Sequence, residues 1–199
     1  MNTFCLSPAD VPGSLYRVQY EDSMTTYDIY GGLKAVNTVT LYDDDGDEQE
    51  EDIDPQEFGD AVQQHLTWDT DYESTFISLF SQRRHAENWM LDRHTRLGSR
   101  NCTLLQIDTA ALNGFFIFRA QEIVDALSLS IPEAAQASVA KEYLIAHCIP
   151  PRAIIRSQTV DEIIAARNPR RPSIPRPLQP SPGDMATPQL IAQLEAMGI

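Results

Sequence analysis

The alternation of apolar and polar positions along the chain predicts a mixed domain of short strands and helices. Short runs of apolar and β-branched residues between turn residues indicate strands, and apolar positions three and four apart indicate helices. Strands are expected at Leu15–Gln19, Asn37–Tyr42, Phe76–Phe80, Thr103–Asp108, Phe115–Phe118, Lys141–Ile149 and Ala153–Arg156. Helices are expected at Pro55–Trp68, Gln82–Leu97, Ala120–Leu127, Pro132–Ala137 and Val160–Arg167. Because strands and helices do not alternate regularly, the order favours an α+β fold over a doubly wound sheet.

Turn and capping residues place several boundaries of these elements. Asp54 before Pro55 is a typical N-cap for the first helix, and Ser81 is an expected N-cap for the second. Gly31-Gly32-Leu33 indicates a loop. The second helix is expected to bury one apolar face, made of Ala86, Trp89, Met90 and Leu97.

Composition divides the chain into three parts. Residues 1–167 have the mixture expected of one globular domain, interrupted by an acidic loop over residues 43–57. Residues 168–186 are rich in proline and arginine, which predicts an extended linker. Residues 187–199 predict a short helix that docks on the domain, binds a partner protein, or begins another domain. The acidic loop reads as a solvated segment, with a site for a cation or a basic partner as the alternative.

Charge and cysteine content narrow the partners and the compartment. The net charge of −14 opposes binding to nucleic acid, which requires a basic surface. No apolar run reaches the roughly 20 residues that span a membrane. Met1–Cys5 has neither the basic nor the apolar region of a secretory signal, and the three cysteines fit a reducing compartment. An intracellular, cytoplasmic location is therefore expected, with secretion left open.

Three polar side chains interrupt strands that otherwise read as buried. Arg17 lies within Leu15–Gln19, Ser78 within Phe76–Phe80, and Glu142 near the start of Lys141–Ile149. A buried charge without a partner is costly, so each of these groups is expected to face a partner or a ligand. In this order they indicate one shared cleft that binds an anionic, sugar-bearing ligand.

These segments resemble mono-ADP-ribosyltransferases of the Arg-Ser-Glu type, the cholera- and pertussis-toxin-like branch, and an uncharacterised fungal domain of the same layout. The resemblance is carried by Tyr16-Arg17, Phe76-Ile77-Ser78, and Glu142 followed by Ile149-Pro150, with Gly31-Gly32-Leu33 at a similar distance after the arginine. It covers roughly residues 14 to 158. It implies two small mixed or antiparallel sheets that form a cleft, with flanking helices.

The resemblance also implies a substrate and roles for individual residues. NAD⁺ would be cleaved between nicotinamide and ribose, and ADP-ribose would pass to a protein acceptor or, in an NAD glycohydrolase, to water. Glu142 would be catalytic with Ser78 in support, and Arg17, Tyr16, Ser78 and His65 would bind NAD. No metal site is expected, because no metal-ligand spacing is present in the sequence.

The sequence departs from the family pattern at two places. Arginine-modifying members carry an acidic residue two positions before the catalytic glutamate, where this chain has Ala140. The family's Ser-Thr-Ser run is Ser78-Leu79-Phe80 here. The alternative is therefore a catalytically inactive domain that serves as a protein-interaction module, in which Arg17 and Glu142 form a structural pair. Likewise, Ser78 could bond only to backbone, and His65 could be a helix-face histidine.

Overall fold

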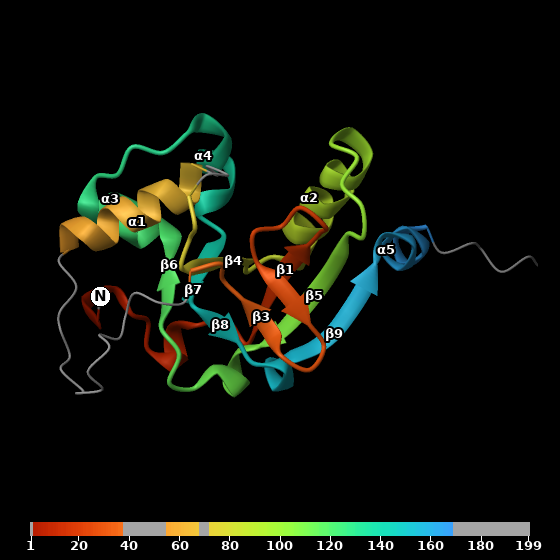
Figure 1. The fold of residues 1–199 in the computed structure, drawn as a ribbon, viewed down its shortest axis with the longest axis horizontal. Helices are drawn as coiled ribbons and strands as arrows, with labels where there is room; N and C mark the ends of the chain where they lie inside the picture. Colours follow the sequence, from red (N-terminus) through yellow and green to blue (C-terminus); the bar gives the residue numbers. More distant parts are fainter. Residues whose placement is uncertain (1, 38–54, 68–71, 169–199) are drawn as a thin grey trace, which may run out of the picture. The chain divides into compact units, whose positions relative to one another are not determined.

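A computed structural model describes residues 2–37, 55–67 and 72–168 of the chain (Figure 1). Residues 1–164 form one compact unit and residues 165–199 another. Of the second unit only residues 165–168 are described, so the predicted linker and the predicted C-terminal helix lie outside the described residues apart from Asn168. The predicted strand Asn37–Tyr42 lies outside them apart from Asn37, and so does most of the acidic loop, while residues 55–57 belong to the first helix.

The α+β prediction is confirmed by two antiparallel sheets with helices around them. The strands of the larger sheet lie in the order β6-β7-β4-β1-β5-β9, and those of the smaller sheet in the order β2-β3-β8. The strands are β1 Ser14–Gln19, β2 Thr26–Asp28, β3 Gly32–Lys34, β4 Phe76–Phe80, β5 Thr103–Asp108, β6 Ile117–Arg119, β7 Glu142–Ala146, β8 Cys148–Ile149 and β9 Ile154–Thr159. The α-helices are α1 Pro55–Thr67, α2 Arg83–Arg96, α3 Ala120–Leu127, α4 Glu133–Val139 and α5 Val160–Arg167.

The larger sheet consists of two three-stranded halves that meet at a narrow seam. β1 pairs with β5 over all six residues of β1, whereas β1 and β4 share only the pair Tyr16↔Phe80. On the other side of the seam, β4 pairs with β7 over its full length. The halves are therefore joined through one residue pair, and the ladder between β1 and β4 does not continue to Arg17 and Ser78.

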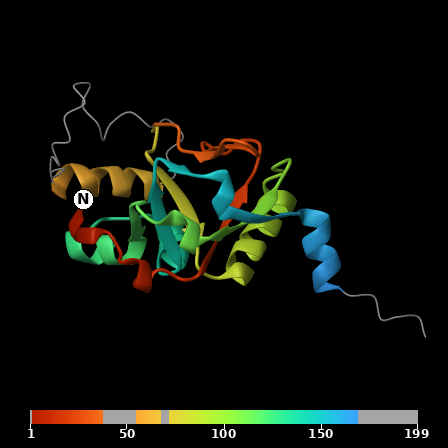
Figure 2. The same ribbon diagram turned by 90° about the horizontal axis from the view of Figure 1, so that it is seen from below.

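Because successive side chains of a strand point to opposite faces of the sheet, the larger sheet contributes to separate apolar cores on its two faces. Leu15, Ile77, Leu79 and Ile145 lie in a core with Leu33 of the smaller sheet, on one face of the larger sheet (Figure 2). On the other face, α1, α3 and α4 cover β6, β7 and β4, and α2 packs on β1 and β5 (Figure 1). Because side chains of a strand point alternately to the two faces, Ser78 and Glu142 share the helix-covered face with Phe80.

The predicted strand Lys141–Ile149 is wrong as a single element. β7 ends at Ala146, His147 has a positive φ of 64°, and β8 then pairs with β3 in the smaller sheet. His147 thus turns the chain from one sheet to the other. An uninterrupted apolar run does not reveal such a turn, because both strands that it joins are largely buried.

Other boundaries differ from the sequence-based expectations. Gly32 and Leu33 were expected in a loop but belong to β3, which pairs with both β2 and β8. The hydroxyl of Ser81 donates to the carbonyl of Lys141 and does not cap α2, whose N-cap is Gln82. Leu97 was expected on the buried face of α2 but is 61% exposed. Within the described residues, no helix combines the length and the apolar character needed to cross a membrane.

Candidate functional site

Arg17, His65, Ser78 and Glu142 come together beside the seam of the larger sheet, and we call them the polar cluster. Arg17 comes from β1, His65 from α1, Ser78 from β4 and Glu142 from the first position of β7. Glu142 lies opposite Phe80 in the β4–β7 ladder, which makes Ser78 its diagonal neighbour on the same face. All four residues are among those predicted from the sequence to form the site.

Arg17 spans the opening between β1 and β4. Its Nη1 donates to the carbonyl oxygen of Ser78 at 3.0 Å, and its Nη2 donates to the hydroxyls of Ser23 and Thr25, each at 3.0 Å. The guanidinium therefore supplies a hydrogen-bond donor to the Ser78 carbonyl, which lies beyond the last pair of the β1–β4 ladder. It also fixes the position of the segment that leads into β2. Its Nε is buried and has no hydrogen-bond partner in the described part of the chain. Arg17 thus keeps one buried donor that none of these three partners uses.

The charges of the polar cluster affect one another. Burial lowers the pKa of Arg17, and the nearby Tyr20 and Glu142 oppose that change. Burial raises the pKa of Glu142, while a hydrogen bond with Ser78 and the positive charge of Arg17 hold it down. Arg17 and Glu142 do not form a direct ion pair among the described residues, so their attraction acts without a shared hydrogen bond. This geometry differs from the buried structural pair considered above.

The ring of His65 points toward Ser78, inside the polar cluster. Its Nε2 lies 2.6 Å from the Ser78 hydroxyl, its Nδ1 lies 2.6 Å from the Ser74 hydroxyl, and its ring meets Phe76 edge-on at 5.8 Å. Val62 and Leu66 are buried on the same side of α1, so the helix that packs on the sheet also carries His65 inward. Burial, and secondarily the charge of Arg17, lower the pKa of His65 to about 3, so the imidazole is neutral at physiological pH.

Tyr16 points away from Arg17. As the neighbouring residue on β1 it faces the α2 side of the sheet, where it packs against the core that contains Val18, Phe80 and Met90. Tyr16 therefore contributes to the apolar core beneath α2. Its role in binding NAD stays a prediction.

Three residues of this region were not predicted from the sequence, namely Ser23, Thr25 and Ser74. Each supplies a hydroxyl to Arg17 or His65, and Thr25 and Ser74 are buried. Serine and threonine are common in the loops where these residues lie, so the sequence carries no signal that separates them from ordinary loop residues.

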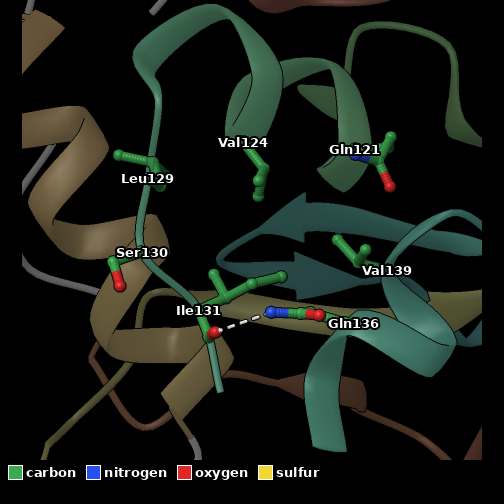
Figure 3. A pocket seen from close by; sticks show the side chains of 7 residues that line it. All are labelled: Gln121, Val124, Leu129, Ser130, Ile131, Gln136 and Val139. Carbon is green, nitrogen blue, oxygen red and sulfur yellow. Dashed lines mark hydrogen bonds between the residues drawn. The ribbon is translucent and has the colours of Figure 1, made fainter. Parts of the chain in front are cut away.

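Two hollows in the described part of the molecule are lined by residues outside the polar cluster. One of about 400 Å³ lies between α3 and α4 and is lined by Gln121, Val124, Leu129, Ser130, Ile131, Gln136 and Val139 (Figure 3). Its lining has no charged side chain, and Gln136 donates to the carbonyl of Ile131 across it. The described residues contain no group of three His, Cys, Asp or Glu side chains placed to hold a metal ion.

Comparison with solved structures finds a similar chain, named EcPltA. The sequence identity is 12% and the TM-score 0.49, over 74% of this chain and 75% of that chain. Similarity at this level does not bear on the activity of this chain. No curated protein matches its sequence.

A family of domains matches residues 10–163, which include all of the polar cluster and both sheets. The match covers well over half of the 199 residues. The chain therefore belongs to the family described as "Domain of unknown function (DUF7587)".

Proposed function

We propose that the polar cluster binds NAD⁺ and cleaves the bond between nicotinamide and ribose, so that ADP-ribose passes to an acceptor or to water. The observation that carries the proposal is the convergence of Arg17, His65, Ser78 and Glu142 from four separate elements beside one seam. The Arg-Ser-Glu pattern of the sequence implies an ADP-ribosyltransferase site with these residue types, which this arrangement supports.

The reaction places positive charge on the ribose. Nicotinamide leaves with the electron pair of the glycosidic bond, which neutralises its ring and leaves an oxocarbenium-like centre at the ribose carbon. The acceptor or water then attacks that carbon and releases a proton. A carboxylate beside the ribose stabilises this centre and accepts a hydrogen bond from the 2′-hydroxyl. We assign this role to Glu142, whose burial strengthens its electrostatic effect.

Arg17 has the charge and the spare donor to hold the diphosphate of NAD⁺. Three of its N–H groups bond to Ser78, Ser23 and Thr25, which fixes the plane of the guanidinium. Its buried Nε–H is without a protein partner among the described residues, as a donor reserved for a ligand would be. Ser78 and the neutral His65 orient Glu142, and neither needs to gain or lose a proton for that purpose.

The alternative is a catalytically inactive interaction module. It is favoured by the occupation of three Arg17 donors within the fold and by Ala140, which is exposed and lacks the acidic group of arginine-modifying members. Both functions predict a stable polar cluster, and only the enzyme predicts turnover of NAD⁺.

Release of nicotinamide from NAD⁺ by the purified chain tests the proposal. Glu142→Gln removes the charge with little change in shape and is expected to lower the rate about 100-fold or more. Glu133→Gln, at an exposed position of α4, is the matched control and should retain the wild-type rate. No release by wild type, or equal release by wild type and a folded Glu142→Gln, would contradict the enzymatic function and favour the interaction module.

A further inference from the structure

A chain of hydrogen bonds runs from a backbone amide to the polar cluster. The N–H of Phe76 lies 3.0 Å from the Ser74 hydroxyl, and that hydroxyl lies 2.6 Å from Nδ1 of His65. Nε2 of His65 lies 2.6 Å from the hydroxyl of Ser78, and Ser78 is the diagonal neighbour of Glu142 in the β4–β7 ladder, where it lowers the pKa of that carboxyl. Ser74 is buried, and its carbonyl also accepts from the N–H of Asn37.

The first bond of this chain fixes its direction. A backbone N–H only donates, so the oxygen of Ser74 must accept from Phe76. The Ser74 hydroxyl proton then needs an acceptor of its own. Within the described part of the chain, the structure offers it one, Nδ1 of His65. Ser74 therefore donates to Nδ1, and this nitrogen must carry a lone pair.

The remaining protons follow from that requirement. A neutral imidazole has one protonated nitrogen, so His65 carries its proton on Nε2 and donates it to the oxygen of Ser78. The hydroxyl proton of Ser78 is then free to point to Glu142. In the opposite tautomer, Ser78 would donate to Nε2 and would have no proton for Glu142, and the buried hydroxyl proton of Ser74 would lose its acceptor.

We propose that Ser74 is a positioning residue that holds His65 in its Nε2–H tautomer and so aims the Ser78 hydroxyl at Glu142. Its consequence for catalysis rests on the proposed function, whereas the direction of the protons does not. Ser74 touches neither Ser78 nor Glu142 in the chain of bonds and acts through His65 alone.

The tautomer is measured directly by the side-chain ¹⁵N chemical shifts of His65 in the whole chain, with the signal assigned by comparison with His65→Gln. Wild type is expected to show the Nε2–H form. Ser74→Ala is expected to shift the ring toward the Nδ1–H form. Ser138→Ala is the matched control, because Ser138 is also buried and its hydroxyl donates to the carbonyl of Ala135 in its own helix. It should leave the signal of His65 unchanged.

Turnover provides the second readout. Ser74→Ala should lower kcat for nicotinamide release about tenfold with a smaller change in KM, and Ser74→Thr, which keeps the hydroxyl, should restore part of the loss. An Nδ1–H tautomer in wild type, or an unchanged tautomer in folded Ser74→Ala, would overturn the role of Ser74. If the predicted tautomer and its loss in Ser74→Ala are observed but wild type releases no nicotinamide, the positioning role stands and the proposed function fails.

Discussion

Glu142 is held where its charge opposes folding. Only 2% of the residue is exposed, and burial raises the pKa of its carboxyl despite Ser78 and Arg17. A carboxyl whose pKa is higher in the folded chain than in the unfolded one binds more protons when folded within that pH interval. Stability therefore falls as pH rises from the unfolded pKa of the group through its folded pKa. A group retained at such a place fits a function and not a contribution to stability.

We predict that Glu142→Gln increases the free energy of unfolding at pH 8 by about 1 kcal/mol, a size typical of relieving an unfavourable functional group. Urea denaturation at pH 8 measures the change. The same comparison below about pH 4, where the carboxyl is protonated in both states, should show the difference shrinking toward zero.

Glu133→Gln serves as the control for this measurement, because Glu133 is exposed and its replacement should leave stability unchanged at both pH values. A folded Glu142→Gln that is less stable than wild type at pH 8 would show that the charge is structural.

At the residue scale, the sequence indicates the members of the polar cluster that lie on strands better than the residues that support them. Arg17, Ser78 and Glu142 stand out because each interrupts an apolar run. His65 is predicted to bind NAD, with a helix-face histidine as the alternative, and only packing of α1 on the sheet shows that it meets Ser78. Ser74 could not be recognised, because its role depends on a contact between a loop and a helix.

Among the elements, the smaller sheet depends on a close approach of its strands. Gly32 begins β3 with φ +77°, and a Cβ built on it would lie 2.1 Å from the carbonyl oxygen of Ile149 in β8. Both the backbone conformation and the space therefore require glycine at this position. The neighbouring Leu33 is fully buried in the core between the two sheets.

Gly32→Ala is accordingly expected to destabilise the chain by about 2 kcal/mol or more, through strain at positive φ and displacement of β8. Thermal unfolding by circular dichroism measures the loss. Gly13→Ala is the control, because a Cβ at Gly13 meets no atom within 4 Å, and it should leave stability nearly unchanged. Equal behaviour of the two variants would contradict the close packing of β3 against β8.

The sequence predicts best those helices and strands whose own residues show a clear apolar pattern. β4, β5, α3 and α5 have the expected bounds. The turn at His147 and the strand assignment of Gly32 and Leu33 depend on which sheet each segment joins, and that choice is made by tertiary packing. The short strand β2 was not predicted, because its three residues are not buried and show no apolar pattern.

For the molecule as a whole, the position of the polar cluster is set by the seam between the two halves of the larger sheet. The single pair Tyr16↔Phe80 joins the halves, and Arg17 fills the opening beside it with bonds to both sides. The resemblance of the sequence to the Arg-Ser-Glu family implies two sheets, and the polar residues within apolar strands predict a shared site. It does not predict this seam, because sheet pairing arises from contacts far apart in the chain.

The central claim is that the polar cluster is a site for NAD⁺. Titration of NAD⁺ into Glu142→Gln, followed by calorimetry, tests it most directly, since turnover is expected to be about 100-fold slower or more in that variant. We predict saturable one-to-one binding. Adding Arg17→Lys, which keeps the charge but loses the planar guanidinium, should weaken it about tenfold or more, while adding the exposed Arg156→Lys should not. No saturable binding, or binding that is indifferent to Arg17→Lys, would contradict the claim.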